Sequence, residues 1–81
     1  MELDARALAF AFVSPGSEEE ASYRRVLEGE VELVTTSVAL FEFAKILVDG
    51  FGWNAVMAEH VVTHVARVAT EVIGAPASDG V

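Results

Sequence analysis

The sequence predicts an α/β fold in which four helices flank a small parallel sheet. Three short segments with strand character, at residues 1–3, 30–34 and 70–73, are separated by helical patterns. Each interval between them holds two predicted helices, and strands joined by helical crossovers pair in parallel. The longest apolar segment, residues 34–50, begins with hydroxyl residues and ends at Gly50, as a helix with caps at both ends does.

The N-terminal segment is predicted to be a strand end followed directly by a helix. Residues 1–3 form the strand end, and Asp4 is a good N-cap for the alanine-rich residues 5–13. The larger side chains of that segment also alternate with a period of two, which is a strand pattern. We favour a helix because alanine is the best helix former and a poor strand residue.

The second helix carries the clearest local signal of the chain. Residues 14–16 have turn chemistry, and Ser17 then precedes Glu20 at the spacing of a capping box. Acidic side chains at this end also face the positive end of the helix dipole. These features predict a helix over residues 17–28 that ends at Gly29.

The central helix is predicted over residues 37–49, directly after the strand at 30–34. Apolar residues occupy almost every position of this helix, so we expect it to be buried nearly all round. Glu42 interrupts the apolar run at its centre. A buried carboxylate is costly unless it is paired or binds a metal, so Glu42 is a candidate functional residue.

The C-terminal part is predicted to be a loop, a long helix and a short strand. Residues 50–53 form the loop, and Asn54 is a suitable N-cap for the helix. Two interpretations of residues 70–73 stay open: helical spacing extends to Val72, whereas the wealth of β-branched side chains favours a strand that leaves this helix early. We expect one domain over residues 1–73 and a flexible tail over residues 74–81. The valines of the helix recur at helical spacing, namely Val61, Val65, Val68 and Val72.

Composition indicates a cytoplasmic protein with a partner-facing surface. An apolar fraction of 53% is high for 81 residues, so we expect a homo-oligomer or a part of a larger fold. The chain has no cysteine, no basic signal-like start and no apolar run long enough to span a membrane. A net charge of −8 excludes a basic nucleic-acid footprint, so contact with nucleic acid would need a divalent cation or a basic surface supplied by a partner.

Two carboxylates are candidate metal ligands. Asp4 follows the first predicted strand, and Glu42 lies in the helix after the second. If those strands are neighbours, both carboxylates converge at one end of the sheet. There they could bind a hard divalent cation such as Mg²⁺ or Mn²⁺. Each also has a purely structural interpretation: Asp4 as an N-cap, and Glu42 as an ion-pair partner of Lys45.

The order of these features resembles the first part of a PIN domain, the fold of many metal-dependent ribonucleases, including VapC-like toxins. The matching features are Leu3-Asp4-Ala5, the acidic helix from Ser17, residues 31–35 leading into residues 37–42, and Phe51-Gly52-Trp53 before the last helix. The resemblance implies that Asp4 and Glu42 are metal-site and catalytic acids of an Mg²⁺-dependent endoribonuclease. It also implies an RNA substrate and an antitoxin-like protein partner.

This chain departs from the family pattern in two ways. Arg6 stands where family members often carry an asparagine, and further metal-site aspartates belong to a second half of the fold that follows these residues. We therefore expect an incomplete version of the fold.

Two other interpretations remain open from the sequence. The first is a non-catalytic interaction domain that acts through homodimerisation or partner binding, because the apolar surplus needs a covering surface. The second concerns His60 and His64, which are four residues apart and can share one helix face. We expect both histidines to face solvent, because they share a polar stripe with Arg67 and Glu71, and the zinc-helix pattern around them is missing.

Overall fold

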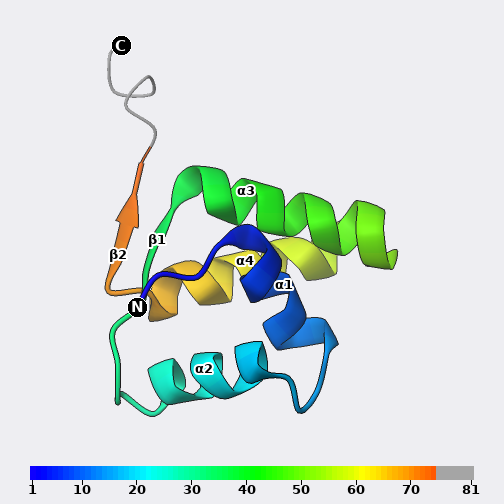
Figure 1. The fold of residues 1–81 in the computed structure, drawn as a ribbon. Coiled ribbons are helices and arrows are strands. Elements are labelled where there is room, and N and C mark those ends of the chain that lie inside the picture. Colours follow the sequence, from blue (N-terminus) through cyan, green and yellow to red (C-terminus); the bar gives the residue numbers. More distant parts are fainter. Residues whose placement is uncertain (75–81) are drawn as a thin grey trace.

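Three segments distant in the sequence meet side by side in parallel. The structure is a computed structural model that describes residues 1–74. Strand β1 (Val34–Thr36) pairs in parallel with β2 (Glu71–Ile73), and Val34 also forms an isolated parallel bridge with Glu2 (Figure 1). The predicted α/β class with a parallel sheet is confirmed, although residues 1–3 contribute a single bridge and not a full strand. The predicted tail lies outside the described residues, apart from Gly74.

Strand β1 begins four residues later than the predicted strand at 30–34. The residues before β1 form the end of helix 18–27. The N–H group of Gly29 donates to the carbonyl of Val26, and that of Glu30 donates to the carbonyl of Arg25. Gly29 adopts a φ of 78°, which turns the chain away from an extended path. Pairing therefore starts only where Val34 reaches its neighbours.

Within residues 1–74, four α-helices lie to one side of this small sheet, whose strand β2 is exposed throughout (Figure 1). Helix α1 spans Ala5–Val13, α2 spans Glu18–Leu27, α3 spans Ser37–Lys45 and α4 spans Ala55–Val68. Each has a side-chain N-cap that accepts a hydrogen bond from the first turn, and the four caps are Asp4, Ser17, Thr36 and Asn54.

The capping box of α2 differs slightly from the predicted pattern. Ser17 Oγ accepts from the Glu20 N–H at 3.1 Å, as predicted. The Glu20 carboxylate accepts from the Gly16 N–H at 2.7 Å, one residue before the cap. Both bonds satisfy backbone donors that the helix start and the preceding turn would otherwise leave without a partner.

Helix α3 continues directly into a π-helical turn, η1 (Ile46–Gly50). The prediction that Gly50 ends this helix is wrong, because Gly52 ends it with a φ of 71°. The Gly52 N–H donates to the carbonyl of Val48, and the Trp53 N–H donates to that of Leu47. These bonds close the helix end in the left-handed manner that glycine permits.

The core lies where α1 packs against α2 and α3, and α4 packs against α3 and faces the same core (Figure 1). Phe12 joins the layers, since its ring centroid lies 5.1 Å from that of Tyr23 and 5.8 Å from that of Phe43. The fully buried side chains around it are Leu8, Leu33, Phe43, Leu47 and Val65. In residues 1–74 we find no helix that is long and apolar enough to cross a membrane.

Candidate functional site

Asp4 lies at the start of α1, directly after the bridge that residue 2 makes to β1. Its Oδ1 atom accepts a hydrogen bond from the Ala7 N–H at 2.8 Å, and the residue is exposed. Asp4 is therefore an N-cap, which is the structural one of the two interpretations that the sequence left open. One carboxylate oxygen is engaged in this way, and the side chain stays accessible to a solvent cation.

Glu42 lies in the middle of α3 and is exposed. The expectation that α3 is buried nearly all round, with Glu42 inside it, is wrong. Only one side of the helix, which carries Leu40 and Phe43, meets the core, while Val38 and Phe41 stay 55% and 67% exposed. Glu42 shares that outer side, so no burial cost has to be explained for its carboxylate.

The surroundings of Glu42 are a shallow hollow of about 370 Å³, lined by Glu42, Lys45 and Ile46. Within residues 1–74, no ion pair joins Glu42 to Lys45. The same part of the chain contains no group of three or more metal-ligating side chains. Asp4 and Glu42 are thus two accessible carboxylates that follow neighbouring parallel segments, without a third acid beside them.

The two histidines lie on the exposed side of α4, as predicted. His64 contacts two aromatic rings, with centroid distances of 6.5 Å to Phe12 and 6.2 Å to Tyr23. The hollow of about 410 Å³ beside the histidines is lined by Glu59, His60, Thr63, His64 and Arg67.

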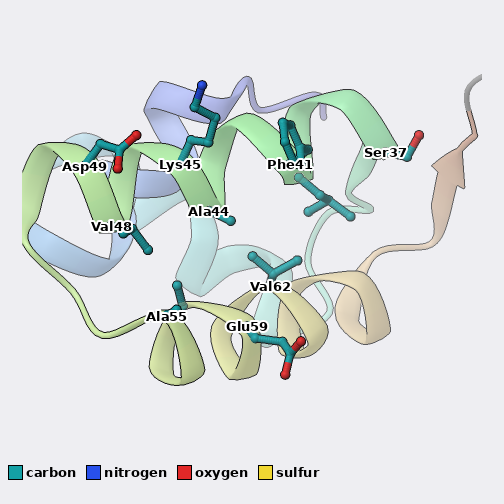
Figure 2. A pocket seen from close by; sticks show the side chains of 11 residues that line it. Ser37, Phe41, Ala44, Lys45, Val48, Asp49, Ala55, Glu59 and Val62 are labelled. Carbon is teal, nitrogen blue, oxygen red and sulfur yellow. The ribbon is translucent and has the colours of Figure 1, made fainter.

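An apolar groove lies between α3 and α4, and sequence reasoning missed it. Its volume is about 510 Å³. Figure 2 shows small and apolar side chains, among them Ala44 and Val62, between the two helices, while Lys45 and Glu59 lie at opposite rims. Small residues on the facing sides of the two helices are the feature of the sequence that could have predicted the groove. They are Ala44, Ala55 and Ala58.

Two buried hydroxyl groups were also missed. Thr35 is 1% exposed and Tyr23 is 4% exposed, and neither hydroxyl makes a hydrogen bond within residues 1–74. A buried hydroxyl without a partner costs free energy, because it gives up its hydrogen bonds to water. Burial also raises the pKa of Tyr23 to about 12.

Replacing Thr35 with valine is expected to stabilise the fold. Valine keeps the branched shape in the middle of β1 and removes the hydroxyl that has no partner, so the free energy of unfolding should rise by about 1 kcal/mol. Urea denaturation of both proteins measures this difference. A loss of stability in the variant would mean that the hydroxyl is hydrogen-bonded in solution.

Searches of protein-family models, of curated proteins and of solved structures find no match to this chain.

Proposed function

We propose that this chain is a PIN-like domain, or the N-terminal part of one, derived from an Mg²⁺-dependent endoribonuclease. The observation that carries the proposal is the parallel meeting of Glu2, Val34 and Glu71 in one small sheet. Asp4 follows the first of these segments, and α3 with Glu42 follows the second. In open parallel sheets, ligands gather where the strands end. As a nuclease acting on cellular RNA, the protein would belong in the cytoplasm.

The donor set suits a hard divalent cation. Mg²⁺ keeps several of its waters and is commonly held by one or two carboxylates, which Asp4 and Glu42 supply. Both residues are exposed, so their carboxylates stay hydrated in the folded chain and carry no free-energy cost of burial. When bound, such a cation stabilises charge at a phosphodiester and lowers the pKa of water.

The roles of the chain's own residues follow from their positions. Asp4 and Glu42 would hold and orient the cation, and their two negative charges raise its local concentration. The chain has a net charge of −8, so the cation would also offset the repulsion between this surface and an RNA phosphate. Endonuclease activity additionally needs the further carboxylates that the PIN resemblance implies, from a following segment or from a partner.

Mn²⁺ titration followed by NMR tests the metal site. Paramagnetic broadening is expected to reach the amides around Asp4 and Glu42 first, and the Glu42→Gln variant should bind about tenfold more weakly because one anionic ligand is lost. Asp4→Asn should weaken binding similarly while keeping α1, since asparagine caps helices as well as aspartate does.

The matched control is Asp49→Asn, which removes an exposed acid at the far end of the same helical segment. It lowers the net negative charge by the same amount, so it corrects for non-specific attraction of cations. Broadening that is equally weakened in Asp49→Asn and Glu42→Gln would remove the metal-site proposal. RNA cleavage that is lost in Asp4→Asn but kept in Asp49→Asn would extend the proposal from binding to catalysis.

A further inference from the structure

We propose that the outer face of α3 and α4 is a self-association surface, on which two copies of this chain pack around a two-fold axis. Each copy would insert Phe41 into the α3–α4 groove of the other. The inference rests on three features of one face: a groove, an exposed ring and charges of both signs. None of these features includes a proposed metal ligand, although Glu42 lies on the same outer side of α3.

The groove supplies the receiving half of the contact. Leu40 and Ala44 line it from α3, Val48 lines it from η1, and Ala58 and Val62 line it from α4. Its volume of about 510 Å³ leaves room for large side chains, since three of its eleven lining residues are alanines. An open apolar cavity of this kind is costly to leave facing water, so a partner that fills it gains binding free energy from its burial.

Phe41 supplies the inserting half of the contact. Its ring is 67% exposed at the edge of the groove, and Val38, one turn earlier, is 55% exposed (Figure 2). Large aromatic side chains dominate binding energy when they enter a well-packed pocket. Because Phe41 and the groove belong to the same face, a two-fold axis can satisfy both at once, each copy giving and receiving one ring.

The charges on the rims are also self-complementary. Lys45 lies on the α3 rim and Glu59 on the α4 rim, and neither forms an ion pair within residues 1–74. A two-fold axis that brings Phe41 over the groove of the second copy sets the α3 rim of one copy against the α4 rim of the other. Lys45 would then face Glu59 of the second copy, twice per dimer.

The size of the face fits a small, reversible interface. Residues 37–50 of α3 and η1 and the 14 residues of α4 each extend about 21 Å, and packed helices lie about 10 Å apart. Two such pairs face to face form a four-helix arrangement, a common way to bury apolar helix faces. The composition agrees, since a chain that is 53% apolar at 81 residues needs a surface on which to bury its surplus.

Sedimentation equilibrium at several protein concentrations, in EDTA, tests the proposal on the whole chain. We expect a reversible dimer, with a mass twice 8.6 kDa, and a dissociation constant raised at least tenfold by Phe41→Ala. The matched control is Leu27→Ala, which shortens another large apolar side chain, 52% exposed on α2 and away from the groove. This control should dimerise as the wild type does.

A charge exchange tests the predicted orientation. Lys45→Glu should weaken the dimer, and combining it with Glu59→Lys should restore it, because the two rims then attract again with reversed signs. Circular dichroism of each variant confirms that it is folded. A wild-type chain that stays monomeric at about 100 µM, or a Phe41→Ala variant that dimerises normally, would overturn the proposal. The EDTA keeps the result separate from the metal-site test.

Discussion

Phe43→Ala is expected to unfold most of the protein at room temperature. The ring is 0% exposed and packs against Phe12, with centroids 5.8 Å apart, in the layer between α1 and α3. Truncating a buried phenylalanine costs about 3–5 kcal/mol, because the lost burial is compounded by a cavity. Small domains have about 5 kcal/mol or little more to lose, so the folded population should collapse. Urea denaturation followed by circular dichroism measures the loss.

Phe41→Ala is the matched control for this prediction. The same substitution, two residues earlier on the same helix, removes a ring that is 67% exposed in a single chain. In dilute solution, where the monomer prevails, its effect on the free energy of unfolding should stay within about 0.5 kcal/mol. Equal losses in the two variants would show that α3 presents a different face to the core.

Raising the pH from 10 to 12 is expected to destabilise the fold by about 2–3 kcal/mol through Tyr23 alone. Burial raises the pKa of this phenol from 10.0 to about 12, because the charged phenolate is poorly solvated at 4% exposure. Between these values the unfolded chain loses the phenolic proton and the folded chain keeps it. The stabilising contribution is therefore complete below pH 10 and is lost as the pH rises toward 12.

Tyr23 is the only tyrosine of the chain, so the ultraviolet absorbance of tyrosinate reports its titration without overlap from other residues of its kind. The folded protein should titrate about two pH units above the urea-unfolded protein. Tyr23→Phe should remove this part of the alkaline loss and remain stable at pH 7, since the hydroxyl has no hydrogen-bond partner within residues 1–74. Coincident titration curves would contradict the burial of the phenol.

The candidate site was predictable in part. The sequence placed Asp4 and the helix carrying Glu42 after two segments with strand character and left their pairing as a condition, which the parallel bridge between Glu2 and Val34 meets. The expectation that Glu42 is buried is wrong, because Glu42 is exposed. An apolar run predicts that a helix is buried without showing which side is covered, and here only one side of α3 meets the core.

Local chemistry by itself determined where most helices of this protein begin. Asp4, Ser17 and Asn54 cap the helices that the sequence predicts, because a cap needs only the few residues that follow it. The tertiary structure alone decided that Phe43 is buried while Phe41 is exposed, and that α3 and α4 leave a groove between them. Burial depends on which elements from distant parts of the sequence pack over a side chain. The residues next to that side chain in the sequence do not specify those elements.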